Sequence, residues 1–181
     1  MPLRAVLIFL AALLSCVFPP AAVSTPVTSK CLAVAQNMPP GFNVQYRKVA
    51  TADDLRPLEN NEVRVTFIGH STFIIESPKG IRAATDYAGW HGRGPIPDIV
   101  TMNHAHETHY TDTPDPAIKH VLKGWGEQGS YAEHNLTVGD MYVRNVPTNI
   151  RDWSGGTEKF GNSAFIFAAG GLCIGDLGHL H

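Results

Sequence analysis

The sequence predicts a sheet-dominated α/β domain, and two observations support this fold class. Residues 63–67 alternate apolar and polar side chains, which is the period of a strand with one buried face, and similar short runs recur downstream. The 17 glycines and 13 prolines indicate many tight turns, which fits short strands joined by loops better than a helical bundle. We therefore expect a run of short strands, few long helices and functional residues at the strand ends.

The strands and turns can be assigned in order along the chain. A turn is expected at residues 77–80, a Gly/Pro-rich loop at 89–97, and one or two helical turns between Thr111 and His120, limited by Pro114 and Pro116. The expected strands are residues 63–67, 72–76, 81–86, 99–102, 121–122, 141–146, 164–168 and 172–174.

The N-terminal segment, residues 1–24, has the pattern of a secretory signal peptide. Arg4 precedes an apolar run over residues 5–14, and Ala22 and Ser24 place small residues where a signal peptidase requires them, so we expect cleavage before Thr25. Two alternatives are an uncleaved membrane anchor and a lipid on Cys16. We expect residues 25–61 to form an N-terminal arm and residues 62–181 to form the domain. The protein would then be periplasmic or secreted.

Charge and cysteine content exclude several classes of function. The net charge of -2 leaves no basic stripe, so no nucleic-acid partner is expected. No CxxC pair is present, which argues against a thiolate zinc cluster. Cys173 lies in an apolar run and is expected to be a buried thiol, although export would allow it to pair with Cys31.

Histidines provide the clearest functional signal. Three of the nine histidines, His104, His106 and His109, fall within six residues directly after the apolar run 99–102. On extended backbone, His104 and His106 point the same way, and a turn can return His109 to the same place. Imidazole nitrogens are favoured zinc ligands, so this spacing indicates a metal centre, with a surface histidine patch as the alternative. His179 and His181 follow Asp176 in a second window.

Four segments together resemble the metallo-β-lactamase superfamily, in particular its ascorbate-phosphate lactonase-like and N-acyl-phosphatidylethanolamine phospholipase-like branch. Residues 63–73 resemble the opening hairpin of that fold, and residues 84–86 resemble a strand that ends in an aspartate. Residues 104–109 are similar to the HxHxDH motif, and residues 174–176 to a strand that delivers a metal-bridging aspartate. The resemblance implies an αββα sandwich.

The resemblance also implies roles for individual residues. His104 and His106 would bind a first metal, His109 would bind a second, and Asp176 would bridge the two ions. Asp86 would orient a ligand histidine through its other ring nitrogen. Apart from the resemblance, His70 follows a glycine at a hairpin, where it either lines the site or serves as a structural histidine. The implied chemistry is attack on an ester, lactone or phosphodiester bond by a metal-bound hydroxide, with zinc as the expected ion and Asp176 and His109 at the reaction centre.

The sequence departs from the family pattern at two positions. Thr108 stands where HxHxDH has its aspartate, which weakens the second metal site. Asn149 stands near the position of the family's next histidine, so the first site lacks a ligand unless Asp152 or His179 replaces it. The chain also ends directly after the Asp176 strand, which suggests that only the first half of the fold is present.

We therefore expect a metal-dependent hydrolase that acts on a small-molecule substrate. Contact with a membrane is expected only through the N-terminal segment. The alternatives are a non-catalytic metal-binding relative and an inactive gene fragment.

Overall fold

The computed structural model describes residues 31, 45, 56–127, 130–152 and 154–179 of the 181-residue chain. The expected signal segment, with its cleavage position and Cys16, lies outside the described residues, as does most of the 25–61 arm. Among the described residues, no helix is long and apolar enough to cross a membrane.

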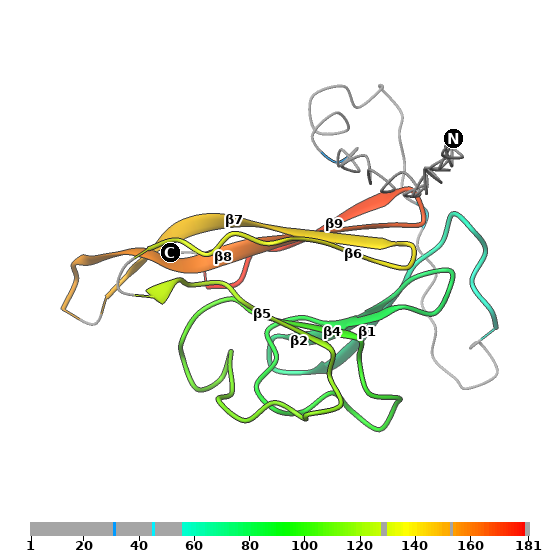
Figure 1. The fold of residues 1–181 in the computed structure, drawn as a ribbon, viewed down its shortest axis with the longest axis horizontal. Helices are drawn as coiled ribbons and strands as arrows, with labels where there is room; N and C mark the ends of the chain where they lie inside the picture. The colour runs from blue at the N-terminus through cyan, green and yellow to red at the C-terminus, as the bar shows by residue number, and fades with distance from the viewer. Residues whose placement is uncertain (1–30, 32–44, 46–55, 128–129, 153, 180–181) are drawn as a thin grey trace, which may run out of the picture.

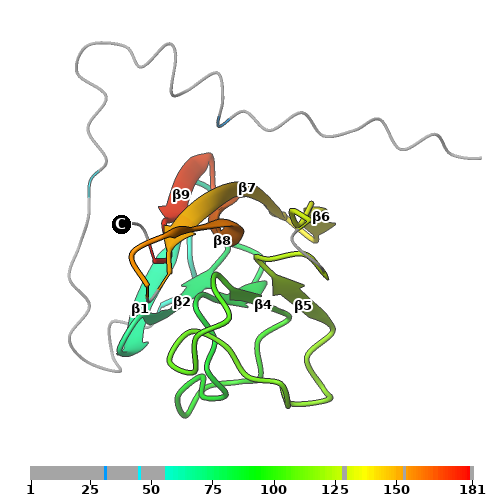
Figure 2. The same cartoon turned by 90° about the vertical axis from the view of Figure 1, so that its left-hand side faces the viewer.

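The described residues contain two β-sheets that face each other (Figures 1 and 2). The first sheet has the order β1-β2-β3-β4-β5, and the second has the order β6-β7-β8-β9. The strands are β1 Arg64–Gly69, β2 Thr72–Glu76, β3 Arg82–Ala84, β4 Ile99–Met102, β5 His120–Lys123, β6 Asn135–Val138, β7 Met141–Arg151, β8 Thr157–Ala169 and β9 Leu172–Asp176.

The first sheet follows the expected strands closely. β1, β2 and β3 pair antiparallel, whereas β3–β4 and β4–β5 pair parallel. The expected turn at residues 77–80 is present, with Gly80 N donating to Ser77 O over 2.9 Å. Between Thr111 and His120 the structure has turns and bends rather than a helix, so this expectation is wrong. Two prolines in this segment remove backbone donors and disfavour helical geometry at the residues before them.

The second sheet is larger than the sequence predicts. β7 and β8 are 11 and 13 residues long, and both extend beyond the apolar runs 141–146 and 164–168. The added residues are mostly polar and pair with each other, as Arg151 does with Thr157. They contain no run of apolar residues from which a strand could be predicted. β6 was not predicted: it has only four residues, of which Asn135 and Thr137 are exposed and Leu136 and Val138 are only partly buried.

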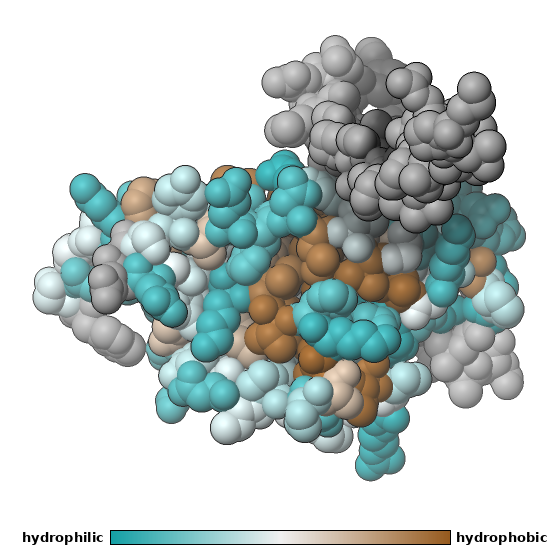
Figure 3. All heavy atoms as spheres, viewed as in Figure 1, coloured by the Kyte–Doolittle hydropathy of each residue, from teal (hydrophilic) through white to brown (hydrophobic). Residues whose placement is uncertain are grey.

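The core lies between the two sheets. Ile75, Ile99, Val143, Phe165 and Phe167 are among its buried members. Apolar side chains also show between the sheets on the face drawn in Figure 3. Part of the apolar layer is therefore exposed at the surface on this face.

The outer face of the first sheet is also buried. Consecutive residues Ile74 and Ile75 point to opposite faces, and both are buried. The outer cluster includes Tyr87 and Ile118, which come from the loops after β3 and β4. Loops therefore cover this face in the described residues, and the helical layers of an αββα sandwich remain a prediction.

Cys31 and Cys173 form a disulfide, so the expectation of a buried thiol at Cys173 is wrong. Along β9, Leu172 and Ile174 are partly buried whereas Cys173 is exposed, because alternate residues of a strand point to opposite sides. The side chain of Cys173 therefore points away from the core, where Cys31 reaches it at a Cα–Cα distance of 5.5 Å. The bond ties the N-terminal part of the chain to the edge of the second sheet.

Candidate metal centre

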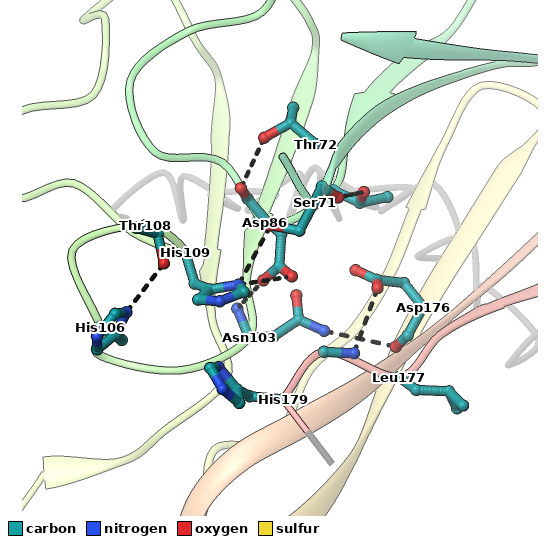
Figure 4. A network of polar contacts seen from close by, with 12 residues as sticks. Ser71, Thr72, Asp86, Asn103, His106, Thr108, His109, Asp176, Leu177 and His179 are labelled. Atoms are coloured by element: carbon teal, nitrogen blue, oxygen red, sulfur yellow. Dashed lines mark hydrogen bonds and ion pairs between the residues drawn. The ribbon is translucent and has the colours of Figure 1, made fainter. Parts of the chain in front are cut away.

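The candidate site lies where the end of β4 meets the second sheet. Ser163 N donates to Asn103 O over 3.0 Å, and His104 forms an isolated β-bridge with Asn162 of β8. The end of β9 reaches the same place, so loops after β3, β4 and β9 all contribute side chains (Figure 4). The site is thus built from both sheets at the ends of their strands.

The three clustered histidines converge as their spacing predicts. The rings of His104 and His106 are nearly parallel, with an interplanar angle of 8° and centroids 6.5 Å apart. Both are half-buried, whereas Ala105 between them is exposed. A turn then follows, in which His109 N donates to His106 O over 2.7 Å. This turn brings the buried ring of His109 to 5.9 Å from that of His106.

Each of these three rings is held through Nδ1. His104 Nδ1 lies 2.5 Å from Gly161 O, His106 Nδ1 lies 2.9 Å from Thr108 Oγ1, and His109 Nδ1 lies 2.9 Å from Asp86 Oδ2. A carbonyl oxygen only accepts, so His104 donates from Nδ1. With Nδ1 used in this way, Nε2 is the nitrogen with which each ring would coordinate a metal.

Asp86 is fixed by several contacts before it meets His109. It has a left-handed backbone with a φ of 45°, its carbonyl oxygen accepts from Thr72 Oγ1 over 2.9 Å, and its Oδ1 accepts from Asn103 N over 3.3 Å. Ser71 Oγ also lies 3.2 Å from His109 Nδ1. The structure thus places Asp86 beside a clustered histidine, where the resemblance puts an orienting carboxylate.

The electrostatics of this pair suit a neutral imidazole. Burial raises the pKa of Asp86 to about 6, so its carboxylate is ionised at neutral pH and accepts a hydrogen bond from His109. Burial, followed by the nearby His70, lowers the pKa of His109. A neutral His109 that donates from Nδ1 presents the Nε2 lone pair that a metal requires.

Asp176 and His179 reach the cluster from the end of β9. Gly178 N donates to Asp176 Oδ1 over 3.3 Å, whereas Asp176 Oδ2 is enclosed and has no hydrogen-bond partner among the described residues. Burial, and then the charge of Asp86, raises the pKa of Asp176 to about 7. The ring of His179 lies 4.6 Å from that of His109 and 6.0 Å from those of His104 and His106.

These residues fit a divalent metal by chemistry and spacing. With Zn–N bonds of about 2.1 Å and tetrahedral angles, two imidazole centroids on one zinc lie about 5 Å apart. Five of the six pairs among these four rings have centroid separations between 4.6 and 6.5 Å. In the described residues, no three His, Cys, Asp or Glu side chains already stand at metal-binding distance, so the rings must turn to bind. The buried, partnerless Oδ2 of Asp176 is the atom that a cation would best stabilise.

Other residues singled out from the sequence have different positions. His70 is exposed on a left-handed turn with a φ of 51°, and its ring lies 5.4 Å from that of His109. Asn149 Oδ1 accepts from Phe160 N over 3.1 Å. Asp152 Oδ1 accepts from Ser154 N and Gly156 N, so it closes its own loop. Of the two proposed replacement ligands, His179 therefore lies in the cluster and Asp152 does not.

Sequence reasoning missed the asparagines of this site. Asn103 and Asn162 are both fully buried and hydrogen-bonded to the segment that carries Asp176 and His179. Asn103 could have been noticed, because a polar amide directly follows a four-residue apolar strand. Asn162 gives no such signal, because it lies within a mostly polar part of β8.

Comparisons with known proteins found similarity to a protein family and to solved structures. Residues 64–181 match the family model described as the beta-lactamase superfamily domain. None of the curated proteins matches the chain. Among solved structures, one similar protein from Parabacteroides distasonis is assigned by name to the metal-dependent hydrolases. It shares 16% identity with a TM-score of 0.48, over 64% of this chain and 60% of its own length.

Proposed function

Because this chain belongs to the beta-lactamase superfamily, we propose that it is a metal-dependent hydrolase of small-molecule substrates. The observation that carries the proposal is the convergence of four imidazole rings beside the enclosed Oδ2 of Asp176. Imidazole and carboxylate ligands favour zinc, which we propose as the ion.

The proposed ligands are His104, His106, His109, Asp176 and His179. A bound zinc would act as a Lewis acid on the substrate and lower the pKa of a water molecule, which is the chemistry needed to hydrolyse an ester, lactone or phosphodiester. The chain's own contribution is to orient the rings. Gly161 O, Thr108 Oγ1 and Asp86 Oδ2 each hold one Nδ1 atom, so the corresponding Nε2 atoms are kept for coordination.

A non-catalytic metal-binding protein is the second candidate. Thr108 and Asn149 stand where the family places an aspartate and a histidine, and both are engaged in other hydrogen bonds. With fewer strong ligands, a centre could bind an ion and still fail to activate water. Metal binding without hydrolysis would favour this candidate.

We also propose that the protein is exported to the periplasm or secreted. The disulfide between Cys31 and Cys173 supports export, because such bonds persist mainly in oxidising compartments. The signal-like pattern of residues 1–24 supports the same location. Reaction of the exported protein with a thiol reagent before and after reduction would test this proposal, and free thiols at both positions would argue against it.

The hydrolase proposal is tested with zinc-loaded protein and a panel containing an aryl ester, a lactone and a phosphodiester. Hydrolysis of at least one compound is expected, with loss on chelation and in His104→Ala/His106→Ala. His120→Ala is the matched control, because His120 lies on β5 and not in the cluster. Hydrolysis that is equal in all three proteins would contradict the proposal.

A further inference from the structure

The buried side-chain amides of Asn103 and Asn162, one from each sheet, form hydrogen bonds with the backbone at the end of β9 and just after it. We propose that Asn103 and Asn162 form an amide clamp that positions Asp176 and His179 for metal binding. This inference rests on the proposed metal site and identifies the residues that assemble its β9 side. Neither asparagine is assigned as a ligand, and both act through the residues that they hold.

Asn103 connects the end of β4 to the second sheet. Its side chain is fully buried, and Nδ2 donates to Ser163 O over 3.0 Å and to Asp176 O over 3.4 Å. Its backbone also accepts from Ser163 N over 3.0 Å. Asn103 therefore fixes the backbone of Asp176 relative to the strand that leads into the histidine cluster.

Asn162 holds the same segment one and three residues further on, at Leu177 and His179. Its Nδ2 donates to Leu177 O over 3.3 Å and to Thr148 Oγ1 over 2.8 Å, and its Oδ1 accepts from His179 N over 3.1 Å. One amide thus binds the backbone on both sides of Gly178. Since Asn162 also forms the β-bridge with His104, it ties His179 directly to the first histidine of the cluster.

Gly178 passes between the two asparagines (Figure 4 shows the residues on either side of it). It has a left-handed φ of 62°, and a Cβ at this position would lie 2.5 Å from Asn103 Cβ and 2.7 Å from Asn162 Oδ1. No side chain fits there without displacing the clamp. The close approach of backbone and amides is what allows the segment to turn and place His179 4.6 Å from His109.

The hydrogen bonds of the two buried amides favour a positioning role over simple packing. A buried amide costs stability unless its groups are paired, so an apolar residue would suit a purely structural core position. Both Nδ2 groups and Asn162 Oδ1 are instead paired with the backbone of residues 176–179 or its neighbours, whereas Asn103 Oδ1 is buried without a hydrogen-bond partner among the described residues. The amide clamp therefore fixes the short segment that carries Asp176 and His179.

The test measures zinc affinity by competition with a fluorescent chelator. Asn162→Ala is expected to weaken binding about tenfold or more, the size seen when residues that orient ligands are removed. Asn145→Ala is the matched control, because Asn145 of β7 also donates two hydrogen bonds, to Ala132 O in the loop before β6 and to Ser163 Oγ of β8. Equal affinities in Asn162→Ala and the parent would overturn the proposal.

A double-mutant cycle separates positioning from general damage. If Asn162 acts through His179, the loss caused by Asn162→Ala should be small in a His179→Ala background. Losses that multiply independently would overturn the coupling. If Asn162→Ala does not fold, the same cycle is run with Asn162→Asp, which is expected to lose less affinity because it keeps the acceptor for His179 N.

Hydrogen exchange tests the amide clamp without metal. The His179 amide is expected to exchange faster in Asn162→Ala than in the parent, and Asn162→Asp should retain most of the protection. If the parent binds no zinc but shows this pattern, the proposed function fails while the positioning of the segment stands. If zinc binds and the exchange and affinity are unaffected, the amide clamp fails alone.

Discussion

Thr108 Oγ1 lies 2.9 Å from Nδ1 of His106, two residues before it in the same turn. The resemblance to HxHxDH compared Thr108 with a metal-binding aspartate, and a hydroxyl is a poor substitute for that ligand. In this structure the hydroxyl instead holds the ring of a neighbouring histidine. The departure from the motif therefore exchanges a proposed ligand for an orienting group.

Removal of the Thr108 hydroxyl should weaken metal binding. Thr108→Ala leaves the His106 ring without this partner, and we expect zinc affinity to fall about tenfold. Thr108→Ser keeps an oxygen at the same position and should stay within about threefold of the parent. Isothermal titration with zinc measures both variants, and equal losses in Ala and Ser would show that the hydroxyl is not responsible.

His179, and not Asn149, should complete the centre. The ring of His179 lies within 6.0 Å of three other imidazoles, whereas Asn149 Oδ1 accepts from Phe160 N. We expect His179→Ala to weaken zinc binding at least tenfold, as loss of one ligand should. Asn149→Ala should leave the affinity unchanged. The reverse order of effects would assign the missing ligand to Asn149 on β7 and would contradict this prediction.

Asp176 should make the metal-free protein less stable as the pH rises. Its folded pKa is about 7, raised from 3.8 mainly by burial, so the folded state binds more protons than the unfolded state between these values. The free energy of unfolding therefore falls as pH rises through this window. Asp176→Asn removes this penalty and keeps an acceptor for Gly178 N.

The metal-free Asp176→Asn variant should thus be more stable than the parent at pH 8, by at most about 4 kcal/mol. The difference should shrink as the pH falls and be nearly lost at about pH 3, below the unfolded pKa of 3.8, where the parent carboxyl is mostly protonated in both states. Urea unfolding in the presence of chelator measures the difference at each pH. A pH-independent difference would contradict the assigned pKa shift.

Reduction of the disulfide should destabilise the domain. Cys31–Cys173 closes a loop with a sequence separation of 142 residues, and loss of a native disulfide costs about 2–5 kcal/mol. Cys173→Ser and the reduced parent should therefore show similar lowered thermal midpoints by calorimetry. Reductant should not change the midpoint of Cys173→Ser, and a further drop there would locate the effect elsewhere.

The sequence predicted the first sheet better than the second for a physical reason. β2 and β4 are short apolar runs whose residues are mostly buried, so their composition alone reveals them. β1 is revealed by its alternation, although its Val65 and Phe67 are exposed. β7 and β8 continue as a polar ribbon beyond the core, where backbone pairing rather than side-chain burial holds the strands. Patterns of apolar residues cannot report such pairing.

The same distinction applies to the candidate site. The convergence of His104, His106 and His109 follows from local spacing and was predictable from the sequence. The side-chain hydrogen bonds of Asn103 join residues 60 and 73 positions apart, and those of Asn162 join residues 14 to 17 positions apart. Local sequence patterns carry no information about such contacts. The expectation for Cys173 failed because an apolar run does not show which side of an edge strand faces the core.

The most direct test of the central claim is the metal content of the purified chain by inductively coupled plasma mass spectrometry. His104→Ala/His106→Ala and the control His120→Ala are measured beside it, after equal exposure to zinc and removal of the excess. The four gathered rings and the enclosed Asp176 Oδ2 predict about one zinc per chain in the parent and control, and little in the double variant. A folded parent without metal, or equal zinc in all three proteins, would contradict the assignment of this site.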